Sequence, residues 1–496
     1  IWSGAVFNRP NPGGRADYWA PGGNSGDDTA IGFSDPAGGI TNTVFDGVVL
    51  TCFRVSGLVI GTGSDAALTR CRVYACNTGK NSGNSALDCG GAILLEDSEL
   101  IGNWRAINLS GAALTVSNLL RSCLFEENSA NSYGAGIRVN STTPILVEQC
   151  RFYRNAGLSE AWRCSATITF NGAGRGWVGD CRFEENRVRG NCHGNVVTEG
   201  NGTFAFARCA FLRNTLVSNS DRAYHSAAVM ALGGNTLVRD SLFEANSCSV
   251  DQSSTEARAW GSAYCGSGGN TTFLNTTFRN NSAAATGTGN AFCGTFASIG
   301  TGPNYAMVHC TVDGSLLNEK SREFINSGAN SGTTFAIVDS VVRSAAPAYA
   351  PFSVSAAVTL CLAESSITGI DTNTLPTGSN GYLYNVTAAD ARLAAHLTPV
   401  ADGVSALGLS GGSPFTRAGR PVWLAADDYL YLYDPVGKPT TPWRRIVNKG
   451  NNYATLASVT LSSPLVPDAL GAPRLAGRLA YGPLNAPPAG TLILLH

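Results

Sequence analysis

The sequence predicts an all-β protein, a single right-handed parallel β-helix solenoid with a C-terminal β cap. Three observations support this prediction. A motif of the form C-x-F-x-x-N recurs with first positions 25 to 35 residues apart. A second element, rich in Gly and small apolar residues, alternates with it. Charged residues make up only 14% of the chain and glycines number 58, a composition that suits short strands and turns better than helices.

The two elements alternate along most of the chain. The first occurs as CRVYACN from Cys71, SELIGN from Ser98, CLFEEN from Cys123, CRFYRN from Cys150, CRFEEN from Cys181, CAFLRN from Cys209, SLFEAN from Ser241 and TTFRNN from Thr276, with weaker copies from Cys310, Ser340 and Ser365. The second occurs as CGGAIL at 89–94, YGAGIRV at 133–139, HSAAVMAL at 225–232, GSAYCG at 261–266 and GNAFCG at 289–294. Each period therefore contains at least two short strands, which is typical of a β-helix coil.

The first and third positions of C-x-F-x-x-N have strand periodicity, so the Cys and Phe side chains should both point into the solenoid. The Asn follows the strand, where we expect its side chain to bond neighbouring backbone and to tolerate a left-handed turn. Stacking of coils about 4.8 Å apart then superposes equivalent residues. The sequence therefore predicts one buried stack of Phe125, Phe152, Phe183, Phe211, Phe243 and Phe278.

The stretch CRFEENRVRGNCHGN, residues 181–195, combines carboxylates, arginines, cysteines and a histidine. It could form a catalytic or metal site. However, the fifth position of successive copies is occupied by Glu127, Arg154, Glu185 and Arg213, so the charge alternates from coil to coil. We therefore expect Glu185 to lie on an outer face between Arg154 and Arg213, in a ladder of ion pairs worth about 0–1 kcal/mol each.

The chain divides by pattern into residues 1–370, the parallel β-helix, and residues 371–496, the terminal coils and C-terminal cap. The aromatic stretch PVWLAADDYLYLYDPVGKPTTPWRR at 421–445 interrupts the second part. We interpret it as strands of a small β module that covers the open end of the solenoid, because an uncovered terminal coil exposes strand edges.

The alternating GGA(I/L/V) and F-x-x-N elements over about residues 40–370 resemble the repeats of polymorphic outer-membrane proteins and other right-handed β-helix surface proteins. The segments ARLAAHLTPVADG at 391–403 and DALGAPRLAG at 468–477 are similar to the closing segments of bacterial β-helix surface proteins. The resemblance implies a secreted or cell-surface protein of bacterial origin. It does not distinguish adhesins from enzymes, since both use this fold.

Composition limits the partners. The formal net charge of −1 gives no reason to expect nucleic acid. No stretch approaches the length of an apolar membrane span, so none is expected in this chain. We expect Ile1 to be a processed or truncated start. A polysaccharide or other copies of the chain are the expected partners.

Fifteen cysteines are present. Those at the first motif position, Cys71, Cys123, Cys150, Cys181, Cys209 and Cys310, are expected to be small buried side chains. Cys265 and Cys293 are expected at equivalent positions of adjacent coils. Cys76, Cys89, Cys164, Cys192 and Cys248 are better placed for disulfides, with pairing left open. No zinc-site spacing occurs, so neither a metal nor a cofactor is expected.

Loops lengthen toward the middle coils and concentrate chemically active side chains. For an enzyme, the catalytic candidates are Glu160, His193, Asp221, His225, Asp251 and Glu256. The candidate ligand contacts, which could stack on or bond a sugar, are Trp162, Arg222, Tyr224, Arg258 and Trp260. An alternative is that the aromatic residues only cover the flank of the coils.

The regular features are ladders, and no motif requires a reaction. We therefore expect a non-enzymatic extracellular or cell-surface structural protein or adhesin, self-assembling or glycan-contacting. The alternative is a polysaccharide lyase or glycoside hydrolase acting in a groove on the mid-chain loops. A hydrolase would need two carboxylates about 5–10 Å apart.

Overall fold

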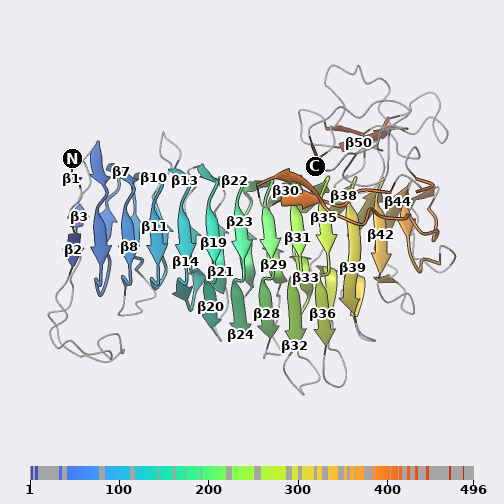
Figure 1. Ribbon diagram of the computed structural model, residues 1–496, viewed down its shortest axis with the longest axis horizontal. Helices are drawn as coiled ribbons and strands as arrows, with labels where there is room; N and C mark the ends of the chain where they lie inside the picture. The colour runs from blue at the N-terminus through green and yellow to red at the C-terminus, as the bar shows by residue number, and fades with distance from the viewer. Residues whose placement is uncertain are drawn as a thin grey trace.

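The computed structural model is an elongated parallel β-solenoid (Figure 1), which confirms the predicted all-β fold. No helix occurs among the described residues. The structure describes residues 2–3, 6–8, 33–35, 42–77, 84–111, 118–140, 142, 144–159, 164–172, 174–190, 193–218, 226–250, 259–285, 293–299, 304–317, 321–326, 333–344, 351–354, 358–363, 365–371, 373, 382–384, 386–402, 404–410, 413–415, 422–424, 430–433, 443–445, 469–470 and 484. Ile1 lies outside them.

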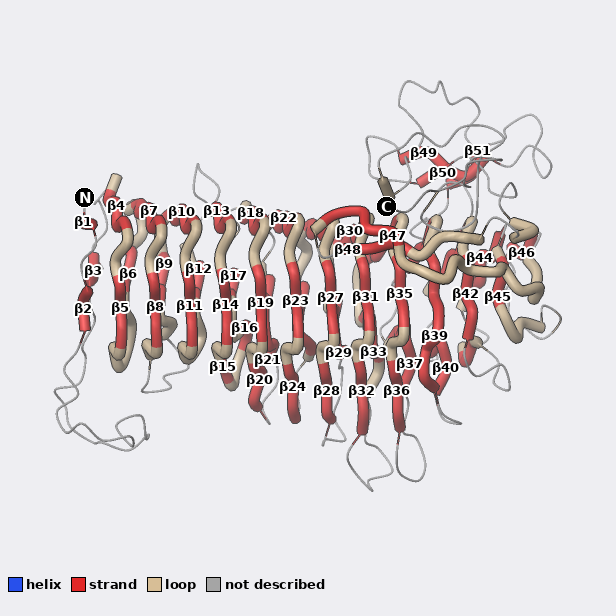
Figure 2. The backbone as a smooth tube through the Cα atoms, viewed as in Figure 1, coloured by secondary structure: helices blue, strands red, loops and turns tan. Residues whose placement is uncertain are grey.

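Three long parallel sheets, A, B and C, form the walls of the solenoid (Figure 2). Sheet A has 14 strands: β1 (Trp2–Ser3), β4 (Thr43–Asp46), β7 (Asp65–Thr69), β10 (Ala92–Glu96), β13 (Asn118–Arg121), β18 (Ile145–Glu148), β22 (Arg175–Gly179), β26 (Thr203–Ala207), β30 (Asn235–Arg239), β34 (Asn270–Leu274), β38 (Asn304–Val308), β41 (Thr334–Val338), β44 (Thr359–Ala363) and β46 (Tyr382–Tyr384). Sheet B contains the F-x-x-N strands: β2 (Val6–Asn8), β5 (Val49–Thr51), β8 (Arg72–Tyr74), β11 (Glu99–Ile101), β14 (Leu124–Glu126), β19 (Arg151–Tyr153), β23 (Arg182–Glu184), β27 (Ala210–Leu212), β31 (Leu242–Glu244), β35 (Thr277–Arg279), β39 (Thr311–Leu317), β42 (Val341–Ser344) and β45 (Ser366–Ile367).

Sheet C has 13 strands: β3 (Phe33–Asp35), β6 (Leu58–Ile60), β9 (Leu87–Cys89), β12 (Ile107–Leu109), β16 (Tyr133–Gly134), β17 (Ile137–Val139), β21 (Cys164–Asn171), β25 (Gly194–Glu199), β29 (Ser226–Ala231), β33 (Gly261–Gly266), β37 (Cys293–Ser298), β40 (Ser321–Asn326) and β43 (Phe352–Ser353). In the central coils a narrower sheet D extends sheet B: β15 (Ser129–Ala130), β20 (Ala156–Ser159), β24 (Arg187–Gly190), β28 (Thr215–Ser218), β32 (Ser247–Val250) and β36 (Ser282–Ala285), with the end of β39. The side chains of Cys164, Val188, Leu216 and Cys248 form a second small core in these coils.

The predicted phenylalanine stack is confirmed. Neighbouring rings from Phe125 to Phe278 lie 4.5 to 4.8 Å apart between centroids, and all six are fully buried. Phe152 of β19 lies opposite Phe183 of β23, and Phe183 lies opposite Phe211 of β27, in direct register. The third position of the repeat therefore forms the centre of the main core.

A ladder of buried asparagines runs parallel to this stack. It contains Asn103, Asn128, Asn155, Asn186, Asn214, Asn246 and Asn281. In Asn186, Oδ1 accepts hydrogen bonds from the backbone N and from Nδ2 of Asn155, while Nδ2 donates to Phe152 O and Asn214 Oδ1. Each interior amide of the ladder thus bonds the coils on both sides, which fixes the coil spacing.

The turn after each sheet B strand differs from the expectation in one respect. The left-handed backbone conformation belongs to the fifth motif position, with φ of 52° at Arg154 and 54° at Glu185, whereas Asn155 and Asn186 that follow are not in this conformation. The Asn side chain forms the hydrogen bonds of the ladder, and the residue before it adopts the left-handed conformation of the turn. Non-glycine residues are uncommon in this conformation.

The motif cysteines are buried and free, as predicted. Burial raises the pKa of Cys209 to about 12, so the thiol stays protonated and inert. Of the cysteines expected to form disulfides, Cys76, Cys89 and Cys164 are also buried and free. Cys192 lies outside the described residues.

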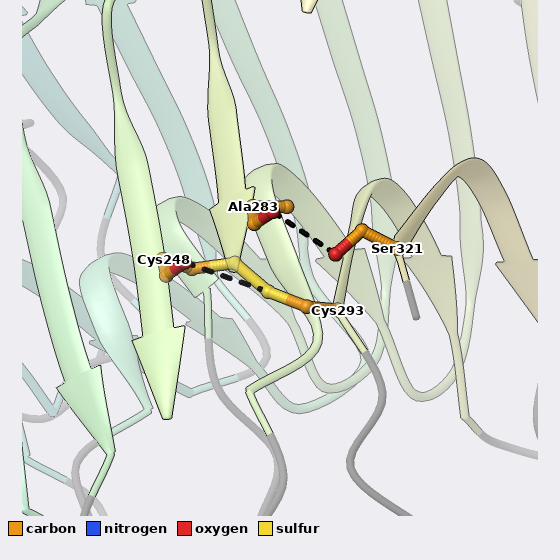
Figure 3. The surroundings of a disulfide bond; sticks show 4 residues. All are labelled: Cys248, Ala283, Cys293 and Ser321. Carbon is orange, nitrogen blue, oxygen red and sulfur yellow. Dashed lines mark hydrogen bonds between the residues drawn. A yellow bond between two sulfur atoms is a disulfide. The ribbon is translucent and has the colours of Figure 1, made fainter. Parts of the chain in front are cut away.

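Cys248 forms a disulfide with Cys293 and links sheet D to sheet C across adjacent coils (Figure 3). The expectation that Cys265 and Cys293 are equivalent is wrong, because Cys265 pairs with Ala297. In this strand pair Gly261 lies opposite Gly294, so the matching residues begin five positions later than the motif alignment places them. The disulfide closes a sequence separation of 45 residues, for which loop entropy gives about 4 kcal/mol.

Two antiparallel sheets follow the solenoid. The aromatic stretch at 421–445 contains β49 (Val422–Leu424), β50 (Leu430–Tyr433) and β51 (Trp443–Arg445), as its strand-like pattern predicted. Its role as a cap over the open end stays a prediction.

A second antiparallel element is the hairpin of β47 (Thr398–Ala401) and β48 (Val404–Ala406). This hairpin runs back over the outer face of sheet B (Figure 2). Val404 packs on Leu212 and Leu242, while Leu407 bonds the hydroxyls of Thr277 and Thr311. The hairpin therefore covers coils whose residues lie much earlier in the sequence.

We predict that Phe183→Ala lowers the free energy of unfolding by about 3–5 kcal/mol, because it leaves a cavity between two stacked rings. Urea denaturation followed by circular dichroism measures this change. Tyr74→Ala, at an exposed position of the same sheet, is the control. Equal effects of the two substitutions would contradict the repeat alignment.

We predict that Asn186→Ala lowers the free energy of unfolding by about 3 kcal/mol or more. The reason is that it leaves the buried backbone N–H of Asn155 without its acceptor, which costs about 1–3 kcal/mol, and also removes one hydrogen bond each from Asn155 Nδ2, Phe152 O and Asn214 Oδ1. Arg187→Ala, at the next and exposed position, is the matched control. Amide hydrogen exchange should show the loss of protection spreading to both neighbouring coils, and an effect no larger than that of Arg187→Ala would contradict it.

A buried carboxyl gives a prediction about pH. Glu323 in β40 is fully buried, and burial raises its pKa from 4.5 to about 7. The folded state therefore holds this proton more tightly than the unfolded state. Stability is lost as the pH rises from about 4.5 through 7, by roughly 3 kcal/mol in total.

Glu323→Gln should remove this pH dependence. The variant should be more stable than the parent at pH 8 and nearly equal to it at pH 5, as measured by urea denaturation at both pH values. An unchanged difference between pH 5 and pH 8 would show that another group is responsible.

Candidate functional site

Most residues of the predicted loop site lie outside the described residues. These are Glu160, Trp162, Asp221, Arg222, Tyr224, His225, Asp251, Glu256 and Arg258. The roles expected for them, catalytic or ligand-binding, stay predictions.

The structure describes the two remaining members of that site, His193 and Trp260, and both are buried. His193 precedes β25, and its backbone bonds Cys164 O and Ser226 N, so it forms part of a coil. Trp260 is only 1% exposed and packs in a cluster with Val197 and Met230 on sheet C. This packing agrees with the alternative that loop aromatics cover the flank. Ligand contact by either residue stays a prediction.

The adjacent carboxylates Glu184 and Glu185 belong to a charge ladder on sheet B, as expected for Glu185. Glu185 lies 3.1 Å from Arg154 and 3.3 Å from Arg213. Glu184 bonds Arg151, Arg182 and Arg213.

These arginines lower the pKa of both carboxyls, in Glu184 against the opposing effect of burial. A general acid needs a raised pKa, so this pair is suited to holding adjacent coils together rather than to proton transfer.

Sheet A carries a row of apolar side chains on its outer face. In β10, Ile93 and Leu95 point into the core, and Leu94 between them is half-buried on the outside. The residues paired with it in successive strands share this position. They form the sheet A stripe, which consists of Val44, Ala67, Leu94, Leu119, Leu146, Trp177, Ala205 and Leu237. At about 4.8 Å per coil the stripe is about 34 Å long.

A groove of about 390 Å³ lies at the N-terminal end of the stripe. Val44, Ala67, Leu94 and Leu119 provide apolar lining, and Asn42, Thr43 and Asp65 provide polar lining. Apolar surface with a few polar groups is the usual composition of a ligand site.

Trp177 supplies an aromatic surface further along the stripe. A Cβ added to Gly179, two residues later, would lie 2.9 Å from Trp177 Nε1. The glycine therefore leaves room for the half-buried indole to lie along the strand, where it offers aromatic surface to an apolar ligand face.

The charges beside the stripe are partly paired. Arg121 lies 3.3 Å from Glu96 on one side and 3.3 Å from Glu148 on the other. One positive and two negative groups leave a small negative excess on this flank, which disfavours an anionic partner and is compatible with an uncharged one.

This surface was not predicted, although the sequence contains a signal for it. The strand that precedes each F-x-x-N element has an apolar outward position in successive copies, from Leu94 through Leu119 and Leu146 to Trp177. The alternation of the F-x-x-N and Gly-rich elements describes sheets B and C and does not reveal this third strand of each coil.

No family model, curated protein or solved structure matches the chain. The structure alone establishes the solenoid and its repeats. Membership of the polymorphic outer-membrane protein family is not shown. Within the described ranges, no helix is long and apolar enough to cross a membrane. The same part of the chain contains no group of three or more His, Cys, Asp or Glu side chains placed to hold a metal ion.

Proposed function

We propose that the protein is a non-enzymatic scaffold or adhesin, outside the cell or on its surface, that contacts a neutral linear glycan through the sheet A stripe. The observation that carries the proposal is the stripe itself. It is one side chain wide and repeats with the coil spacing over about 34 Å. A stable protein interface buries about 1,200–2,000 Å² in a broad patch, whereas a narrow row fits an extended chain.

The chemistry of the stripe supports a sugar polymer. Leu119, Leu146 and Trp177 offer surface for the apolar faces of pyranose rings, and the polar groups of Asn42, Thr43 and Asp65 can bond hydroxyls. The disulfide between Cys248 and Cys293 supports an oxidising compartment, as expected for an exported protein.

The alternative function, a polysaccharide lyase or glycoside hydrolase, depends on loop carboxylates outside the described residues. Among the described residues, the adjacent carboxylates Glu184 and Glu185 are paired with arginines. The scaffold is therefore the better-supported proposal.

We predict that Leu119→Gln and Trp177→Ala each weaken binding to a neutral polysaccharide by about tenfold, as expected for loss of a central contact. Pull-down with insoluble cellulose, chitin and xylan identifies the polymer, and affinity electrophoresis measures the change. Leu158→Gln, at an exposed leucine of sheet D, and Glu185→Gln are the controls and should bind normally.

The same samples are assayed for new reducing ends and for absorbance of unsaturated product. Turnover by the parent protein would overturn the non-enzymatic assignment. Loss of binding in Glu185→Gln, with normal binding in both stripe variants, would place the site on sheet B. Association of the parent protein with itself, abolished by Leu119→Gln, would identify a second copy as the occupant.

A further inference from the structure

The outer face of sheet C carries a polar cluster in its early coils. Asp88, Asn108 and Arg138 are paired in register on β9, β12 and β17. Their neighbours along each strand, such as Leu87 and Cys89 beside Asp88, are buried in the main core. Because side chains alternate along a strand, the three polar side chains lie together on the opposite face. Further along the same row the residues become apolar.

Two neighbouring side chains complete the cluster. The Cζ atom of Arg138 lies 4.0 Å from the ring centroid of Tyr133, so the guanidinium is held over the ring. Arg105 is fully buried, and its guanidinium donates hydrogen bonds to Ser132 O and Oγ, both at 2.7 Å. Asp88, Asn108, Arg138, Tyr133 and Arg105 are called the sheet C cluster below.

The sheet C cluster contains two guanidiniums and one carboxylate. Asn108 Nδ2 donates to Asp88 Oδ1 at 2.7 Å. Burial, and then repulsion by Arg138, lowers the pKa of Arg105 to about 10. The two cations therefore lie close enough to repel each other, and one additional anion would balance the charge of these described groups.

Asn108 Oδ1, an acceptor, and Arg138 Nε, a donor, are buried atoms of the cluster that have no hydrogen-bond partner among the residues that the structure describes. Asn108 is only 6% exposed, so an unused acceptor there is costly. A ligand that supplies both an acceptor for Arg138 and a donor for Asn108 would satisfy both atoms.

We infer that the sheet C cluster binds a hydroxy carboxylate, in the form of a uronic acid unit. Its carboxylate accepts hydrogen bonds from the guanidinium of Arg138, which lies over the Tyr133 ring and can make a two-pronged contact with a carboxylate. A ring hydroxyl donates to Asn108 Oδ1, and a second hydroxyl bonds Asp88. A neutral sugar leaves the excess positive charge in place, while a simple carboxylate leaves Asn108 unsatisfied.

This site lies on a different wall of the solenoid from the sheet A stripe, so either proposal can fail alone. Isothermal titration calorimetry with the full chain compares glucuronate, trigalacturonate, glucose and acetate. We expect glucuronate and trigalacturonate to bind and glucose and acetate to bind at least tenfold more weakly. Binding of acetate as strong as that of glucuronate would overturn the assignment of a hydroxy acid, and no heat with any uronate would overturn the site.

Arg138→Gln should reduce uronate binding at least tenfold, whereas Arg138→Lys should retain part of it because the charge remains. Arg151→Gln is the matched control, since Arg151 also lies over a tyrosine, Tyr153, on sheet B. Circular dichroism and melting of each variant establish that it is folded. Uronate binding by folded Arg138→Gln equal to that of the parent would overturn the inference. Loss of stripe binding without loss of uronate binding in Leu119→Gln would separate the two sites.

Discussion

The asparagine ladder is the interaction on which the rest of the structure depends. In a parallel solenoid each coil must pair with its neighbours in one register. The hydrophobic effect does not select this register, because it is not directional. Each interior Asn amide of the ladder, as in Asn186, donates to the coil before it and to the coil after it, and its oxygen accepts two hydrogen bonds. A slip by one residue would leave several buried groups without partners. The ladder therefore fixes the register, and the register aligns the phenylalanine stack.

Fixed register also turns single positions of the repeat into continuous surfaces. The outward position of sheet A becomes an apolar stripe through Leu94 and Leu119, while the outward positions of sheet B become a charge ladder around Glu184 and Glu185. Sheet C changes along its length, from the polar Asp88 and Asn108 to the apolar Val197 and Met230. Function on such a scaffold is specified by what successive copies of one position have in common.

The sequence was sufficient to predict which repeat positions stack into rows, but not the register of every strand pair or the segments that cover the rows. The Phe and Cys rows followed from the period of the motif, and the place of Glu185 between Arg154 and Arg213 followed from alternating charge. Cys265 and Cys293 were misaligned because GNAFCG resembles GSAYCG, whereas the residues that pair with Gly261 to Gly266 are Gly294 to Ser298. The hairpin over sheet B was missed because its partners, such as Thr277 and Leu407, are 130 residues apart and share no motif. The loop site was predicted from residue types alone, and those types are equally suited to packing, as Trp260 shows.

The returning hairpin has a consequence for how the chain is made. Ribosomes synthesise a protein from its N-terminus, so the coils that contain Leu212 and Leu242 can stack before residues 398–406 exist. Until those residues emerge, the apolar outer surface of these coils faces water and is open to unwanted association. A later part of the chain thus closes the middle of the solenoid, so a chain truncated before residue 398 would leave the apolar outer surface around Leu212 and Leu242 exposed to association with other molecules.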